Sequence, residues 1–146
     1  MKRRRIQVTV NYAALLLMNI AFYFVYIGKS ASHIYDVIGL TSIVVVGVTF
    51  RSVHWKTGIW KLTHTKSKEL DERELTLTHW ALSQSYAWFA VICLVIMFAF
   101  ALSSRMNICP QYTISIPLVG SLIYLSHTLP GSIIAWKAGK LPEDTE

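Results

Sequence analysis

The residues of this chain that are best suited to acid-base chemistry or metal binding are widely separated. Three histidines, His54, His79 and His127, fall within or at the ends of apolar segments. Paired imidazoles on facing helices can bind haem or a metal ion, but no two of these histidines share a helical face at a spacing of four residues. The zinc-peptidase, nucleophile-elbow and phosphate-loop motifs do not occur in the sequence. We therefore predict no catalytic residue, no cofactor and no metal, with His127 hydrogen-bonded among packed helices.

A charged motif, Asp71-Glu72-Arg73-Glu74, precedes the third apolar segment. Asp71 is a good helix cap, and Glu74 stands three residues later as in a capping box. Acidic residues also stabilise the positive end of a helix. Two interpretations stay open: the motif is only a well-capped helix start, or it is also an interaction site for a partner or for the arginines at positions 3–5.

A second polar group, Ser126, His127 and Thr128, lies inside the fourth apolar segment. Pro130 follows it, and a proline inside a helix cannot donate to the carbonyl four residues earlier, which here belongs to Ser126. We expect a kink beside a small polar pocket, which is either structural or a hinge or ion site. Asparagine, glutamine and serine in the other segments are expected to hydrogen-bond across helices.

Four apolar segments position these residues, and they cover about residues 8–27, 34–53, 80–102 and 114–136. A helix needs roughly 20 apolar residues to cross the hydrocarbon core, where no water satisfies an open backbone. If the third helix runs from Asp71 to Ser104, it extends about 51 Å, against a core of about 30 Å. We therefore predict that its first turns project from the membrane.

The positive charges indicate how the segments are oriented. Of the 14 Lys and Arg residues, all but Lys29 and Arg105 precede the first segment, lie from Arg51 at the end of the second segment to Arg73 before the third, or follow the fourth. Cytoplasmic connections are enriched in these residues, so both termini and the loop of residues 54–79 are predicted to be cytosolic. The first apolar run is longer than the core of a signal peptide, which favours an uncleaved anchor.

The loop between the second and third segments indicates a lipid partner. It mixes tryptophans with lysines, a composition suited to a membrane surface that carries anionic lipid. The cations are dispersed along juxtamembrane segments, which argues against nucleic acid as a partner. Cys93 and Cys109 form no C-x-x-C motif, so thiol redox chemistry is not expected.

The order of these features resembles a known kind of protein. Two spans, a cytosolic loop, Asp71-Glu72-Arg73-Glu74 and two more spans are similar to the small uncharacterised prokaryotic four-span membrane proteins that carry an Asp-Glu-Arg motif before the third span. The resemblance implies the four-span layout, and it implies no activity.

The sequence thus predicts one all-α domain over residues 1–146, an integral membrane four-helix bundle with both termini inside and its third helix extended into the cytosol. The expected function is that of a non-enzymatic accessory or regulatory component of the plasma (inner) membrane, which acts through its cytosolic loop on a membrane-protein partner or on a second copy. The alternative is a subunit of a small oligomeric transporter or channel.

Overall fold

The computed structural model describes residues 2–26, 33–65, 71–105 and 115–137, and every regular element in these ranges is helical. The elements are α1 (Lys2–Tyr26), α2 (Ile34–Phe50), the π-helical turn η1 (Arg51–Trp55), α3 (Ile59–His64), α4 (Glu72–Arg105) and α5 (Ile116–Lys137). Four helices of the described chain are long and apolar enough to cross a membrane, as the sequence predicted. The second of these runs from Ile34 to Trp55, because η1 continues α2 without a break.

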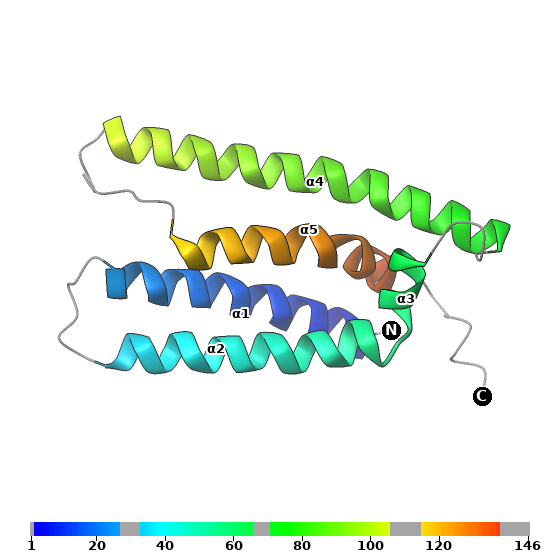
Figure 1. Ribbon diagram of the computed structural model, residues 1–146, viewed down its shortest axis with the longest axis horizontal. Coiled ribbons are helices and arrows are strands. Elements are labelled where there is room, and N and C mark those ends of the chain that lie inside the picture. Colours follow the sequence, from blue (N-terminus) through cyan, green and yellow to red (C-terminus); the bar gives the residue numbers. More distant parts are fainter. Residues whose placement is uncertain (1, 27–32, 66–70, 106–114, 138–146) are drawn as a thin grey trace.

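The helix α1 packs against both α2 and α5, and α4 lies along the outside of α5 (Figure 1). Small buried residues allow the backbones to approach closely, such as Ala14 and Ala21 on α1 and Gly39 on α2. A Cβ atom on Gly39 would lie only 3.3 Å from the ring of Phe22. In lipid the hydrophobic effect does not drive helices together. Close packing through small side chains therefore holds these helices in contact.

Contacts between the helices show which ends lie together. The Arg5 Nε donates to the Trp136 carbonyl at 3.2 Å, which joins the start of α1 to the end of α5. Gln7 of α1 donates to the Ser52 hydroxyl of η1 at 2.8 Å. The Lys137 ammonium lies 4.1 Å from the centre of the Trp80 ring on α4. The starts of α1 and α4 therefore meet the ends of the second long helix and α5 at one end of the molecule, which we call the basic end.

The segment between η1 and α4 folds back at the basic end. Gly58 has a φ of 66°, in the left-handed region that glycine adopts without a steric penalty, and α3 begins at the next residue. Ile59 of α3 is fully buried beside Gly131 of α5. The first part of the predicted loop is therefore a short helix packed on α5.

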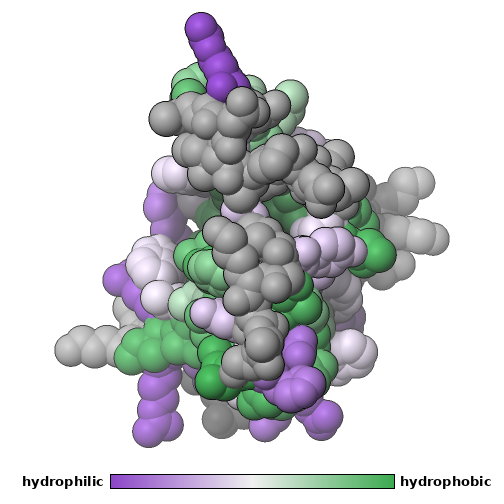
Figure 2. All heavy atoms as spheres, turned by 90° about the vertical axis from the view of Figure 1, so that its left-hand side faces the viewer, coloured by the Kyte–Doolittle hydropathy of each residue, from purple (hydrophilic) through white to green (hydrophobic). Residues whose placement is uncertain are grey.

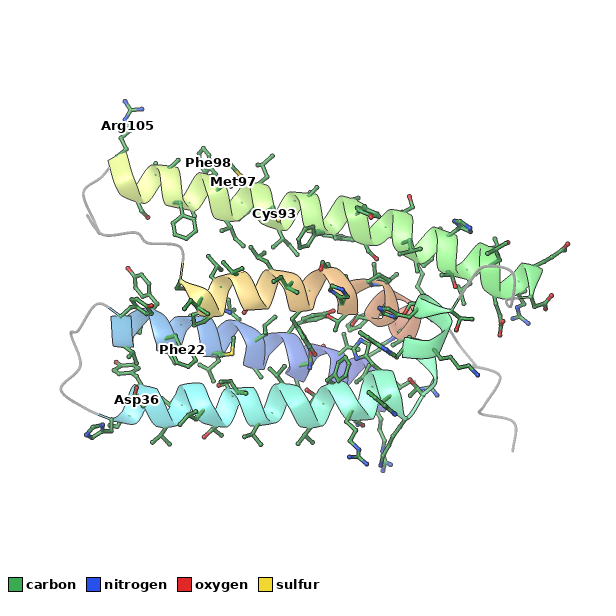
Figure 3. The ribbon with its side chains drawn as sticks, in the orientation of Figure 1. Phe22, Asp36, Cys93, Met97, Phe98 and Arg105 are labelled. Carbon is green, nitrogen blue, oxygen red and sulfur yellow. The ribbon has the colours of Figure 1, made fainter. Side chains whose placement is uncertain are left out.

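The helix α4 differs from the other three in how little of it is buried. It begins at Glu72 and passes beyond the other helices at the basic end (Figure 1). Along its apolar part, Met97 and Phe98 point away from α5 and are exposed (Figure 3). In the view from the end opposite the basic end, hydrophobic side chains are interspersed with hydrophilic ones (Figure 2). The apolar exterior along α4 suits a lipid environment, because hydrocarbon solvates such side chains.

Candidate functional site

A buried polar cluster joins three elements at the basic end. It comprises Tyr12 of α1, His54 of η1, and Thr128 and Ser132 of α5, and we call it the His54 cluster. The His54 Nε2 lies 3.3 Å from the Thr128 carbonyl oxygen and 3.3 Å from the Ser132 hydroxyl. The Tyr12 hydroxyl donates to the Ser132 hydroxyl at 2.7 Å. His54 is only 1% exposed, so these contacts are made away from solvent.

The local sequence explains why an imidazole fits at this position. The wide turn of η1 shifts His54 relative to a regular α-helix, and its ring stacks on Phe50 with centres 5.1 Å apart. On the other side, Gly131 leaves room for the ring, because a Cβ there would lie 3.0 Å from the His54 Cδ2. Gly131 directly follows Pro130 inside α5, so the proline and the close contact share one turn.

One nitrogen of the His54 ring is left without a partner. The Thr128 carbonyl only accepts hydrogen bonds, so that contact is a hydrogen bond only when the imidazole hydrogen is on Nε2, whereas the Ser132 hydroxyl can pair with either tautomer. The Nδ1 atom is buried and forms no hydrogen bond within the described part of the chain. A buried ring nitrogen without a partner can donate or accept a hydrogen bond, according to the tautomer of the ring. This atom is the strongest candidate for polar chemistry between the helices.

Two asparagines extend the polar contacts along α1. Asn11 donates to the Thr49 hydroxyl at 2.7 Å and to the Val46 carbonyl at 3.2 Å, and it accepts from the Tyr124 hydroxyl at 3.1 Å. Asn19 donates to the Ser121 hydroxyl at 2.7 Å. The prediction that such residues hydrogen-bond across helices is therefore confirmed for both asparagines.

The predicted pocket of Ser126, His127 and Thr128 is not formed as expected. Thr128 is buried, whereas Ser126 and His127 are exposed. The His127 Nδ1 lies 2.9 Å from the Ile123 carbonyl of its own helix, so the prediction that His127 is hydrogen-bonded among packed helices is wrong. Consecutive residues of a helix point about 100° apart, so three in a row cannot line one face. The buried histidine is His54, which belongs to a different element.

The charged motif lies where the sequence placed it, at the start of α4. The Glu72 amide donates to the Asp71 carboxylate at 2.7 Å, and the Glu74 carboxylate accepts from the Asp71 amide at 3.4 Å. The Glu74 contact is the returning half of the predicted capping box. Asp71, Glu72 and Arg73 are exposed, and Glu74 is half-buried.

Arg5 is one of the arginines expected to pair with the charged motif, but its side chain contacts Trp136 instead. Its guanidinium lies 5.5 Å from the centre of the Trp136 ring and donates to the carbonyl of that residue. Neither Glu72 nor Arg73 forms a side-chain ion pair with another described residue. Their charges therefore face outward from the projecting part of α4.

Neither Tyr12 nor Ser132 was predicted from the sequence to belong to a site. A tyrosine in an apolar helix is usually an ordinary packing residue, and nothing local distinguishes Tyr12. The adjacent Pro130 and Gly131 were the available signal for Ser132, because a glycine beside a proline marks a place where another element can approach.

The described chain is thus an all-helical, multi-pass membrane protein by the length and composition of its helices. Comparison with known proteins adds no relative: no family model, no curated protein and no solved structure matches this chain.

Proposed function

We propose that the protein is a small non-enzymatic component of the plasma membrane that regulates or assists a membrane-protein partner. In this proposal both termini and the basic end face the cytosol, and the partner binds to the start of α4. Anionic lipid contacts the surrounding cations. The proposal rests on one observation above all, which is the outward-facing charge of Glu72 and Arg73 on a helix that extends beyond its neighbours (Figure 1).

Capping accounts for only half of the charged motif. Asp71 and Glu74 hydrogen-bond backbone amides at the start of α4, so they have a structural role. Glu72 and Arg73 contribute side chains that the fold of the described chain does not use. A pair of opposite charges on a rigid, projecting helix suits an ionic contact with another protein.

The basic end also has the composition of a surface that contacts anionic lipid. Exposed cations at this end come from α1, η1, α3, α5 and the turn between η1 and α3, and exposed tryptophans accompany them. These residues are Arg3, Arg5, Arg51, Lys56, Lys61, Lys137, Trp55 and Trp136. Each well-placed cation contributes roughly 1 kcal/mol of attraction to such a leaflet. The same distribution favours the cytosolic orientation of this end.

Charge reversal in the motif tests the docking proposal. We expect Glu72→Lys and Arg73→Glu to weaken capture of a specific partner in crosslinking from native membranes, and the loss to depend on salt because the contact is ionic. Thermal stability should change little, because neither side chain is used by the fold. Asp71→Asn keeps a good cap while removing one charge, so it separates capping from docking.

Arg105→Glu is the matched control, because it makes the same change of charge at the opposite end of α4, where Arg105 points away from the other helices (Figure 3). We expect it to leave the partner set unchanged. If the motif variants also leave the partner set unchanged, the motif is only a helix start.

Cysteine labelling tests the orientation. In a background without Cys93 and Cys109, a cysteine at Lys61 should react only after the membrane is permeabilised, because it lies at the basic end. A cysteine at His33, whose side chain is 97% exposed at the start of α2, should react from outside. Labelling of position 61 from outside would reverse the proposed orientation.

The second candidate is a subunit of a small oligomeric transporter or channel. It is favoured by the unpartnered His54 Nδ1 and by the polar contacts of Asn11 and Asn19 inside the helices. Polar groups at membrane depth often mark an ion or proton pathway. Proton or ion flux into vesicles that contain the purified protein, abolished by His54→Phe, would favour this candidate over the docking proposal.

A further inference from the structure

The outer side of α4 carries polar groups that the fold of the described chain does not use. Ser83 and Gln84 are exposed, and neither side chain forms a hydrogen bond within that part of the chain. Each of the other described amide side chains forms at least one: Gln7, Asn11 and Asn19. Glu72 and Arg73 are also exposed, and neither forms an ion pair with a described residue. Two pairs of neighbouring side chains on α4 are therefore left unused.

Gln84 lies within the apolar part of α4. One turn before it, the centre of the Trp80 ring lies 4.1 Å from the ammonium of Lys137, the last residue of α5. The 22 residues of α5 extend about 33 Å, close to the thickness of the hydrocarbon core, so the end of α5 marks the edge of that core. Hydrocarbon solvates apolar side chains but cannot satisfy an amide. Gln84 therefore requires a protein group that the described chain does not supply.

The two pairs lie in line along the helix. Ser83 follows Glu72 by eleven positions, and Gln84 follows Arg73 by the same number. Eleven positions make about three full turns of an α-helix, and successive residues point about 100° apart. Glu72 and Ser83 therefore form one edge of the outer side of α4, and Arg73 and Gln84 form the other edge.

A stripe of exposed side chains runs between these edges. Its members recur at intervals of three and four residues, and we call it the outer stripe: Ala87, Val91, Leu94, Phe98 and Ala101. Phe98 points away from α5 (Figure 3). The buried residues of α4 lie on the opposite side of the helix: Thr78, Ala81 and Ser85. A mean interval of 3.5 residues is the one at which two helices pack along their length.

Resting on the docking function proposed above, we propose that the partner at α4 is a second copy of this chain, in a two-fold symmetric pair whose α4 helices run parallel and meet along the outer stripe. Both copies have the same orientation in the membrane, which requires the parallel arrangement. A two-fold axis places each edge of one helix against the other edge of the second helix. Glu72 then faces Arg73 of the second copy, and Gln84 faces Ser83 of the second copy.

Self-pairing satisfies all the unused groups of this surface at once. Opposite charges meet in two ion pairs, and each amide meets a hydroxyl, which can donate or accept. Ala87, one turn beyond Ser83, is small enough to let the two backbones approach closely at this level. Lipid tails would cover the outer stripe but would leave the amide unpaired.

Energy transfer between donor-labelled and acceptor-labelled copies in liposomes tests the pair. The full chain is labelled at a cysteine in place of Lys61, in the background without Cys93 and Cys109, and lipid is added until chance encounters no longer contribute. We expect the parent to keep its energy transfer, and Gln84→Leu to weaken association about tenfold because two interhelical hydrogen bonds are lost. Tyr86→Leu is the matched control, because it removes an exposed hydroxyl that points away from the outer stripe.

Charge exchange tests the two-fold geometry. Glu72→Lys and Arg73→Glu each place like charges opposite one another in a self-pair, so each variant should associate with itself more weakly than the parent does, in a salt-dependent way. A mixture of the two variants restores opposite charges at both contacts. Donor-labelled Glu72→Lys should therefore associate with acceptor-labelled Arg73→Glu as strongly as two parent copies do. All the substituted side chains are exposed, so the variants should keep the unfolding behaviour of the parent.

The outcomes separate this pair from the docking function. Loss of energy transfer in the parent on addition of lipid would overturn the assignment to a second copy. Failure of the two charge variants to associate with each other would overturn the two-fold arrangement. If Glu72→Lys releases a different captured protein and leaves self-association unchanged, the docking function stands and the second copy is excluded. If neither self-association nor capture changes, both proposals fail.

Discussion

Gly131→Val should lower the free energy of unfolding by about 3 kcal/mol, one of the two largest effects that we predict for a single substitution. A Cβ at this position would lie 3.0 Å from the His54 Cδ2 and 3.0 Å from the Ile59 Cγ2. Both neighbours are buried, so neither can move into open space. The branched side chain must therefore push η1 and α3 away from α5. Titration with SDS from mixed micelles, followed by circular dichroism, measures the change.

Gly120→Val is the control for this substitution. Gly120 lies on the same helix, but no atom of another element lies within 4 Å of the position of its Cβ. A helix interior favours most residues over glycine, so we expect no loss of stability there. Removing one of the obstructing groups with Ile59→Ala should make the double variant less destabilised than the sum of the two single variants. Equal effects of valine at positions 131 and 120 would show that α3 does not pack on α5 as described.

Asn11→Ala should be the most damaging removal of a polar side chain, with a loss of about 2 kcal/mol. Asn11 is 1% exposed and makes three hydrogen bonds that join α1 to α2 and α5. Hydrogen bonds between membrane helices contribute roughly 0.6–2 kcal/mol each. The substitution also leaves the Tyr124 hydroxyl without its acceptor. The same SDS titration measures the loss.

Asn19→Ala is the control, because it deletes the same atoms from the same helix. Asn19 makes a single bond to another helix, to the Ser121 hydroxyl, and its other bond is to the Leu15 carbonyl of α1. We expect it to lose less than half as much stability as Asn11→Ala. A larger loss at Asn19 would contradict the central position that the contacts give to Asn11.

The long helices of this protein were predictable because their causes are local. Apolar length sets the span of a membrane helix, and the acidic cap at Asp71 sets where α4 starts. Both are written in consecutive residues, so α4 begins and ends within a residue of the predicted positions. Pairing of polar residues across helices was predictable as a class, since a buried amide in hydrocarbon needs a partner.

Which polar residues hydrogen-bond to one another depends on tertiary structure. Which side of α5 faces inward is set by its rotation against α1 and η1, and that rotation buries Thr128 while leaving His127 exposed. His54 enters the interior because η1 widens the end of the second long helix and Gly131 leaves space for the ring.

The position of α3 against α5 also could not be predicted from the sequence. A left-handed residue at Gly58 reverses the chain, and only then does His64 reach His127, which lies 63 positions away in the sequence. Apolar length and caps act within a few consecutive residues, so the sequence by itself determined the number of long helices, their approximate ends and the charged start of α4. Helix rotation and chain reversal depend on packing between distant segments, so only the tertiary structure decided which polar residues meet.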